Sequence, residues 1–215
     1  MTVRPDLENA RFLPEPEATR SVSTLERAGA ATTAAVRRPR RYDPDRRNRL
    51  VTAALDVIAE HGVAGASHRV IARAADVPLG STSYHFATLD ELLAAAFTVH
   101  AEAVADALDQ RMQVAANREA ALDALASHLA QDVLGADRVL VLAVELYLAA
   151  VRRPRLRAVT QAWMVRSRRA LELHFDPVTA RELDALIEGL VLHQALSTEP
   201  MTTEQVRHAL LRFIR

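Results

Sequence analysis

Cysteine and lysine are both absent from this 215-residue chain, and aromatic residues make up only 4% of it. The absence of cysteine excludes disulfide bonds and thiol chemistry. All 27 basic residues are arginine, a bias that the sequence itself does not explain. Only six residues are glycine, whereas half of all residues are hydrophobic. This balance favours helices rich in alanine and leucine over β-sheets.

Long apolar runs are also missing. Uninterrupted apolar runs such as residues 139–144 are far too short to span a bilayer, so no membrane partner is expected. Residues 1–20 are polar and contain proline, which is unlike a secretory signal and predicts a cytoplasmic protein. The formal net charge is zero. No global electric field therefore draws this chain to nucleic acid, and any attraction must be local.

Residues 67–86, SHRVIARAADVPLGSTSYHF, predict two short helices joined by a tight turn. Ser67 can cap the first helix, because its hydroxyl can accept from a free amide of the first turn. Val70, Ile71 and Ala74 are spaced to share one apolar face of that helix. The pattern breaks at Asp76, which tolerates a left-handed backbone.

The second short helix follows Pro78, which lacks an N–H and suits a helix start. Thr82 and Phe86 are four residues apart and should face inward. The outward face then carries small hydroxyls, a glycine and an aromatic side chain: Gly80, Ser81, Ser83, Tyr84 and His85. Such a face can press against a phosphate backbone and base edges, so the sequence predicts a DNA-binding helix-turn-helix.

Residues from about 44 to 92 resemble the DNA-binding domain of the tetracycline-repressor (TetR) family of bacterial transcription regulators. The resemblance lies in an amphipathic helix ending in HG, the SHRVIARAADV helix, and VPLGSTSYHF followed by TLDELL. It implies DNA contacts by Ser67, His68, Arg69, Leu79, Gly80, Ser81, Ser83, Tyr84 and His85. The chain departs from the family pattern at Ser81-Thr82-Ser83, where a Thr-Leu-Tyr run is common, at Leu89, where lysine is frequent, and at Asp76, which replaces a turn glycine.

Three regions are predicted along the chain: a disordered basic extension (1–42), the helix-turn-helix domain (43–90) and a ligand-binding and dimerisation domain (91–215). The extension ends in a basic run that includes Arg40 and Arg41. This run is either an arm that contacts DNA or a solvated linker. Asp43 and Pro44 are expected to open the first helix and Gly62 to end it, with an apolar stripe between them formed by Leu50, Ala54, Val57 and Ile58.

Helical periodicity continues to the end of the sequence. Thr88 and Glu91 have the spacing of a capping box that opens a long helix to about residue 112. Further helices are expected at 117–133, 138–152, 155–174, 179–198 and 203–214. The fold class is therefore all-α, with about nine helices in total.

Segment 138–152 is apolar nearly all round, which predicts a central buried helix. Glu145 interrupts it, and a buried carboxylate must be paired or protonated. Glu145 is either the polar anchor of a ligand cavity walled by Tyr147, Trp163 and Met164, or the partner of an arginine.

The last two predicted helices have apolar stripes wider than one core contact needs. Together with the resemblance, these stripes predict a homodimer whose interface includes Leu186, Gly189, Leu190, His193, Leu210 and Phe213. Burial within the same chain is the alternative for these side chains.

The predicted function is a ligand-responsive transcriptional regulator, most simply a repressor. Its expected partners are a double-stranded DNA operator, a second copy of the chain and a small, largely apolar effector. A helical protein-interaction module without specific DNA binding is the alternative. A metal site built from His100, His128, Glu145 and His193 is disfavoured, because no two of them have the i, i+3 or i+4 spacing of ligands on one helix. The sequence has no nucleophile elbow, phosphate-binding glycine loop or catalytic carboxylate pair, so it predicts neither an enzyme nor a cofactor.

Overall fold

The all-α prediction is confirmed by a computed structural model, which describes residues 45–213. Nine α-helices and one short π-helix, η1, occupy these residues, and no strand is present among them. All described residues belong to one compact unit, Tyr42–Arg215. The helices are α1 (Arg46–Gly65), α2 (His68–Ala74), α3 (Leu79–His85), α4 (Leu89–Val114), α5 (Arg118–Ser127), η1 (His128–Val133), α6 (Asp137–Ala150), α7 (Pro154–Leu171), α8 (Pro177–Leu196) and α9 (Thr203–Phe213).

Helix α1 begins at Arg46, and Asp45 occupies the preceding cap position. The expected opening residues Asp43 and Pro44 lie outside the described part of the chain. The predicted apolar stripe of α1 is buried as expected. Gly62 interrupts the helix with a φ of +68°, a conformation that glycine adopts without steric cost. A last turn then continues to Gly65, so the predicted end at Gly62 is a break within α1.

The first helix of the predicted motif is packed differently from expectation. Ser67 caps α2 as predicted, accepting from the Val70 amide at 3.3 Å. However, Val70 and Ala74 are exposed, and Ile71 is buried together with Ala72 and Ala75. The predicted face was wrong: α2 turns the side with Ile71 and Ala72 to the core, and a seven-residue helix has too few positions for spacing alone to identify that side.

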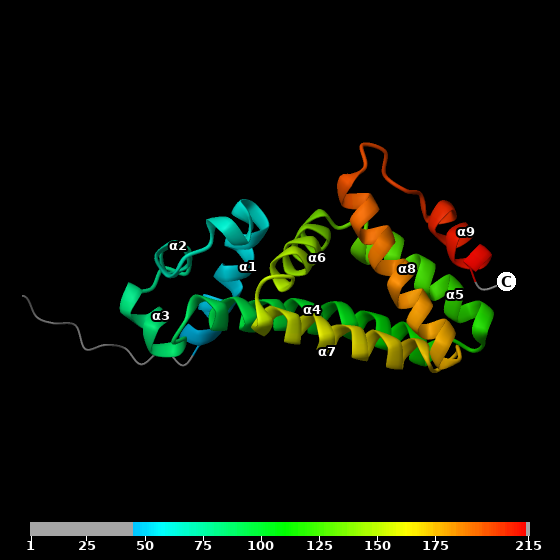
Figure 1. The fold of residues 1–215 in the computed structure, drawn as a ribbon, viewed down its shortest axis with the longest axis horizontal. Helices are drawn as coiled ribbons and strands as arrows, with labels where there is room; N and C mark the ends of the chain where they lie inside the picture. The colour runs from blue at the N-terminus through cyan, green and yellow to red at the C-terminus, as the bar shows by residue number, and fades with distance from the viewer. Residues whose placement is uncertain (1–44, 214–215) are drawn as a thin grey trace, which may run out of the picture. The chain divides into compact units, whose positions relative to one another are not determined.

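Helices α4 and α7 lie side by side (Figure 1). Their pairings show that they run parallel: Arg153 contacts Asp90 near the start of α4, and His174 contacts the Met112 carbonyl near its end. Helix α6 packs against both α1 and α8, so it lies between the first three helices and the C-terminal ones (Figure 1). The helix that separates these two groups is therefore in contact with both.

Two hydrophobic clusters fill the interior. The first joins α1–α3 to α4, α6 and α7 and contains Leu50, Ile71, Phe86, Phe97 and Leu146. The second joins α4, α5, η1, α6, α7, α8 and α9. Because the first cluster continues from α1 into α6 and α7, the first three helices share a core with the helices that follow them.

Helix α6 is less enclosed than its composition predicted. Leu142, Leu146 and Ala150 are buried, but Leu148 and Val151 are mostly exposed. The prediction of burial all round was therefore wrong for one face, which no other described helix covers.

Cap residues set several helix boundaries. Thr88 accepts from the Glu91 amide at 3.2 Å, which confirms the predicted cap. The Glu91 carboxylate reaches back as expected, but it accepts from the Ala87 amide at 2.9 Å, one residue before the position that a capping box uses. The expected helix at 117–133 is split, since α5 passes into the π-helix η1 at His128. Such π-segments are frequent at functional sites.

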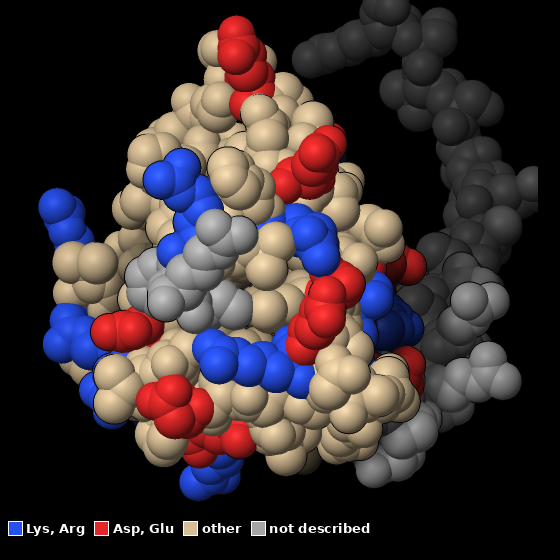
Figure 2. All heavy atoms as spheres, turned by 90° about the vertical axis from the view of Figure 1, so that its right-hand side faces the viewer, with Lys and Arg blue, Asp and Glu red and all other residues tan. Residues whose placement is uncertain are grey.

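None of the described helices has the length and hydropathy to cross a membrane. Figure 2 shows the face at the α5 and α9 end, where acidic and basic side chains are interspersed. One pair on these two helices, Arg207 and Asp123, is in direct contact. This face presents no extended field of one sign, in keeping with the zero net charge.

Candidate DNA-binding surface and effector cavity

A side chain of α1 holds the turn between α2 and α3 in place. Asp76 has a φ of +50°, the left-handed conformation predicted for it. The Arg49 guanidinium donates to the carbonyl oxygens of Ala75 and Asp76, at 2.8 and 3.0 Å. These bonds satisfy carbonyl groups that the end of α2 leaves without helical partners. Arg49 therefore fixes the angle at which α3 leaves the turn.

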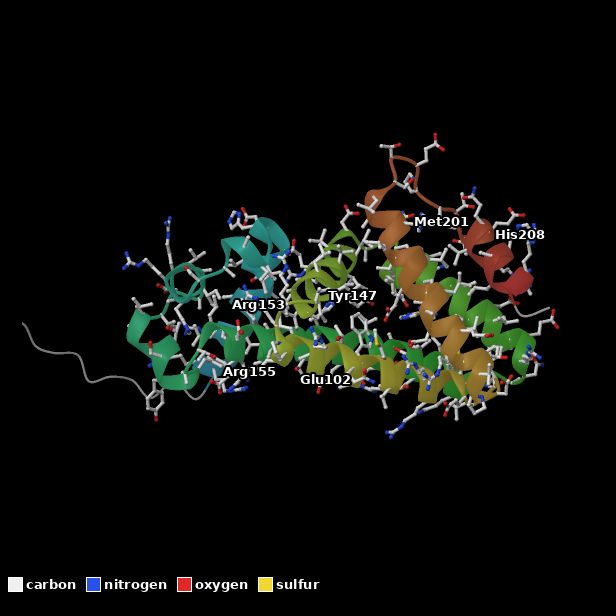
Figure 3. All side chains as sticks on the ribbon, in the orientation of Figure 1. Glu102, Tyr147, Arg153, Arg155, Met201 and His208 are labelled. Carbon is white, nitrogen blue, oxygen red and sulfur yellow. The ribbon has the colours of Figure 1, made fainter. Side chains whose placement is uncertain are left out.

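Replacing Arg49 with methionine is expected to lower the free energy of unfolding by about 1–3 kcal/mol, because both carbonyls lose this charged donor. Urea unfolding without DNA measures the effect. The matched control is Arg155→Met, since Arg155 is exposed on α7 (Figure 3) and its loss should cost less than about 0.5 kcal/mol. Equal stability of the two variants would contradict a structural role for Arg49.

Helix α3 has its buried and exposed sides as predicted. Thr82 and Phe86 are fully buried, and Thr82 donates to the Leu79 carbonyl at 2.7 Å. The Arg47 guanidinium lies over the Phe86 ring, 5.1 Å from its centroid. Tyr84 is 85% exposed, and a Cβ added at Gly80 would meet no atom within 4 Å.

The predicted DNA-contact residues that the structure describes lie together on α2, α3 and the cap of α2. Leu79, Gly80, Ser83 and Arg69 are exposed, and Ser67, His68, Ser81 and His85 are partly exposed. The rings of Tyr84 and His85 meet edge to face, with centroids 5.0 Å apart. Arg40 and Arg41 lie outside the described residues.

A cavity lies among α4, α5, η1, α6, α7 and α8. Tyr147, Trp163 and Met164 line it together, as the sequence predicted for three of its four ligand residues. Tyr147 projects from α6 (Figure 3), and its ring stacks on Trp163 with centroids 5.9 Å apart. The other lining residues are mostly aliphatic, with four polar exceptions: His128, Ser167, Asp184 and Glu188.

Two carboxylates of α8 dominate the electrostatics of the cavity. Asp184 is buried and bonds the Arg168 guanidinium at 2.8 Å. Burial raises the pKa of Asp184, and Arg168 partly offsets this. Burial, and then the neighbouring Asp184 charge, raise the pKa of Glu188 to about 7. Among the described residues, no hydrogen bond or ion pair is made by the Glu188 carboxylate.

A second polar group comes from the π-helix. His128 is almost fully buried, and its Nδ1 lies 3.0 Å from the Asp132 carboxylate, which also contacts Arg111. Burial lowers the pKa of His128 despite Asp132, so the ring is neutral at pH 7. Asp132 itself keeps a lowered pKa, because the hydrogen bonds from His128 and Arg111 outweigh its burial. An ionised carboxylate can only accept, so Nδ1 carries the proton and Nε2 is an acceptor.

Glu145 is not one of the residues that line this cavity, and within residues 45–213 it pairs with no arginine. Its Oε2 accepts from the backbone amide of Val63 at 2.7 Å. Its Oε1 would lie 3.0 Å from a Cβ added at Gly62. Both predicted roles were wrong, because the break at Gly62 frees a backbone amide that needs an acceptor, and α6 supplies it. Glu145 thus connects the cavity-lining helix to α1.

Two ion pairs lie on either side of this contact. Arg138, at the start of α6, contacts Asp56 of α1 at 2.7 Å. Arg153, just after α6 (Figure 3), contacts Asp90 of α4 at 2.8 Å. Both pairs are substantially solvent-exposed, so each contributes at most about 1 kcal/mol.

The predicted dimer residues fall into two groups. Leu190 and Leu210 are buried within the chain, because α8 and α9 pack on α5, η1 and α6. They therefore take the alternative role, burial in the same subunit. Leu186 and Gly189 are partly exposed and His193 is exposed. Phe213 ends α9, and its side chain lies outside the described part.

The candidate metal residues are dispersed over four helices. His100 is buried on α4, with a pKa lowered to about 4 mainly by its burial, and its ring meets Trp163 edge to face. His128 lies in η1, Glu145 faces α1, and His193 is exposed on α8. Within residues 45–213, no three His, Asp or Glu side chains are grouped so as to hold a metal ion.

The cavity's polar residues were missed by sequence reasoning, although a signal existed. Asp184 and Glu188 are four residues apart within an apolar stripe that includes Leu183, Ile187 and Val191. The sequence-based prediction treats the stripe as a dimer surface and does not explain its two acids. Two acids on the buried side of a helix are a signal for a binding cavity.

An exposed helix on a three-helix domain, joined to a helical body with an internal cavity, defines the class of DNA-binding transcriptional regulators. Comparison with known proteins agrees. Residues 50–96 match the family model for bacterial regulatory proteins of the tetR family, and residues 116–215 match the tetracyclin repressor-like C-terminal domain.

Three similar proteins illustrate the match. SCO7518 of Streptomyces coelicolor A3(2) is 47% identical, with a TM-score of 0.72 over 79% of this chain and 98% of its own. The multidrug binding protein EbrR, solved with ethidium, is 42% identical, with a TM-score of 0.71 over 80% and 99% of the two chains. The transcriptional regulator BetI of Cronobacter sakazakii is 28% identical over 80% of this chain and 90% of its own.

The chain belongs to the TetR family of transcriptional regulators. Its N-terminal helices are the DNA-binding domain of that family.

Proposed function

We propose that this protein is a repressor that binds a palindromic operator as a homodimer and is released by a small aromatic effector. The observation that carries the proposal is the position of α6. One side of this helix gives Ala143 and Tyr147 to the cavity, and another side gives Glu145 to the break in α1. A change in the cavity that moves α6 therefore acts on the DNA-binding helices directly.

The DNA contacts come from the exposed side of α3 and the N-terminal end of α2. Tyr84 and Ser83 supply hydroxyl groups that can donate to phosphate oxygens, and Gly80 lets the backbone approach closely. Arg69 adds a positive charge at the edge of this surface. The basic run containing Arg40 and Arg41 supplies a further phosphate contact from the N-terminal side.

The homodimer is formed through the exposed side of α8. Leu192 and Leu196 are large apolar side chains there, 43% and 77% exposed, beside Gly189, at which a Cβ would meet no atom within 4 Å. Such a surface allows a second helix to approach closely. A dimer places two recognition helices about one DNA turn apart, roughly 34 Å, as a palindrome requires.

The effector acts by population shift. It must bind the state that cannot hold the operator more tightly than the state that can, or DNA binding does not change. The present cavity of about 40 Å³ is smaller than the roughly 300–1,000 Å³ of ligand pockets, so binding must enlarge it. Structures of the similar protein EbrR hold ethidium, proflavin or malachite green. The stacked Tyr147 and Trp163 suit an aromatic effector of that kind.

The experiment is to measure binding of the purified chain to DNA tiles from the region upstream of its own gene. Two salt concentrations separate specific binding from general phosphate attraction. We expect one palindromic tile to be bound at both concentrations by two copies of the chain. Equal, strongly salt-sensitive binding to every tile would contradict a repressor specific for a site next to its own gene.

A further inference from the structure

We infer that the effector is an aromatic cation bearing N–H donors, and that Glu188 is the residue that receives its positive charge. This inference rests on the proposed effector cavity and names the chemistry of its ligand.

The aromatic walls define the shape of the ligand. Tyr147 and Trp163 stack at 30° to one another, so a planar group that enters beside them meets an aromatic face. The ring faces carry negative partial charge, which attracts a cation more than a neutral ring. The rest of the lining is mainly aliphatic, and it cannot bind a hydrophilic ion such as a sugar phosphate.

The polar lining of the cavity supplies acceptors and negative charge. Asp184 already has a partner in Arg168, and this pair leaves no net charge. Glu188 lies one turn further along α8 and has no recorded ion-pair or hydrogen-bond partner among the described residues. Its elevated pKa expresses the cost of that unpaired charge. A cation placed against Glu188 would remove the cost.

His128 gives the cavity a second acceptor. Its Nδ1–H is committed to Asp132, so Nε2 of this buried, cavity-lining ring can only accept a hydrogen bond. A ligand that fills the cavity without an N–H or O–H group would bury this atom unsatisfied, at a cost of about 1–3 kcal/mol. The site therefore selects a cation that also donates hydrogen bonds.

A groove next to the cavity supplies the space that such a ligand needs. It has a volume of about 420 Å³ and lies over α6, α7 and α8. Gly189 and Leu192 line it, so the groove borders the proposed homodimer surface. Tyr147, Met164 and Glu188 line both the groove and the buried cavity. These three side chains form the wall between the two spaces. Moving Tyr147 and Met164 aside joins the two spaces into one site of ligand size, which Glu188 lines.

The site should respond to pH through Glu188. Five groups face it: Asp184 on its own helix, Arg157 and Arg168 on α7, Tyr147 on α6 and His128 in η1. The Arg157 guanidinium is held by the backbone carbonyls at the end of α6 and does not change charge near neutrality. Arg168 is paired with Asp184, Tyr147 is neutral because burial raises its pKa, and His128 is neutral because burial lowers its pKa. Glu188 alone changes charge near neutrality. Below its pKa it must lose a proton before it can pair with a cation, so affinity for a cation rises with pH.

The experiment is a titration of the full chain without DNA, followed by calorimetry or dye fluorescence. The probes are proflavin, a planar cation with amino groups, and acridone, a neutral tricycle of similar outline. We expect proflavin to bind at least about tenfold more tightly than acridone at pH 8, and to lose much of that advantage at pH 6. Glu188→Gln should lower the affinity for proflavin at least about tenfold and leave the affinity for acridone unchanged. It should also remove the pH dependence of proflavin binding.

Glu182→Gln is the matched control, because Glu182 is exposed on the same helix and its loss should change neither affinity. Thermal unfolding of each variant checks that the fold is kept. Equal affinity for the two probes, no binding of proflavin, or unchanged proflavin binding by the Glu188 variant would each overturn the inference. Because no DNA is present, these outcomes are independent of whether the protein binds an operator.

Discussion

Replacing Tyr84 with alanine is expected to weaken operator binding by about tenfold to one-hundredfold. The side chain is 85% exposed at the outer face of α3, so its hydroxyl is free to reach a phosphate oxygen. A hydrogen bond to a charged group contributes about 1.5–3 kcal/mol, which corresponds to this loss. The measurement is the anisotropy of labelled operator DNA titrated with each protein.

The variant Tyr84→Phe separates the hydroxyl from the ring. It should lose nearly as much affinity as Tyr84→Ala if the phosphate contact dominates, and little if the ring packs on the sugars or bases. Neither change should alter the unfolding free energy by more than about 0.5 kcal/mol, since the residue is exposed. Unchanged operator affinity in the alanine variant would exclude α3 as the recognition helix.

Replacing Glu145 with alanine is expected to have two large effects. It should lower the free energy of unfolding by about 1–3 kcal/mol, because the amide of the mostly buried Val63 loses its acceptor. It should also blunt the release of DNA by effector, because α6 then loses its bond to the break in α1. Urea unfolding measures the first effect, and an effector titration of the operator complex measures the second.

Two control variants show whether the hydrogen bond is responsible. Glu145→Gln keeps an oxygen acceptor and should preserve most of the stability and of the response. Arg138→Met removes the exposed pair with Asp56 and should cost less than about 1 kcal/mol. If Glu145→Ala responded to effector as the unmodified chain does, the proposed path through α6 would be contradicted.

Local features of the fold could be predicted because short-range chemistry decides them. The left-handed Asp76, the caps by Ser67 and Thr88 and the burial of Thr82 and Phe86 each depend on a few neighbouring residues. The side of α2 that faces the core depends on tertiary packing instead. The seven residues of this helix give too short a pattern to distinguish a face that includes Val70 from one that includes Ala72.

The site was harder to predict because its residues meet only in three dimensions. Tyr147, Trp163 and Met164 could be selected as amphipathic wall residues of apolar helices, and they do line one cavity. As the acid of an apolar helix, Glu145 is predicted to be either a cavity anchor or the partner of an arginine, but its partner is a backbone amide that sequence cannot reveal. The spacing of Asp184 and Glu188 within an apolar stripe is a signal for a cavity, but the residues they face on α6 and α7 are set by tertiary packing.

The most direct test is whether occupancy of the cavity controls operator binding. The operator complex of the purified chain is titrated with proflavin, and the same titration is repeated with Glu188→Gln. Proflavin itself intercalates into DNA, but that effect is identical for both proteins. We expect the unmodified complex to dissociate at a dye concentration at least about tenfold lower than the variant requires. Release of both complexes at the same concentration would contradict control from this cavity.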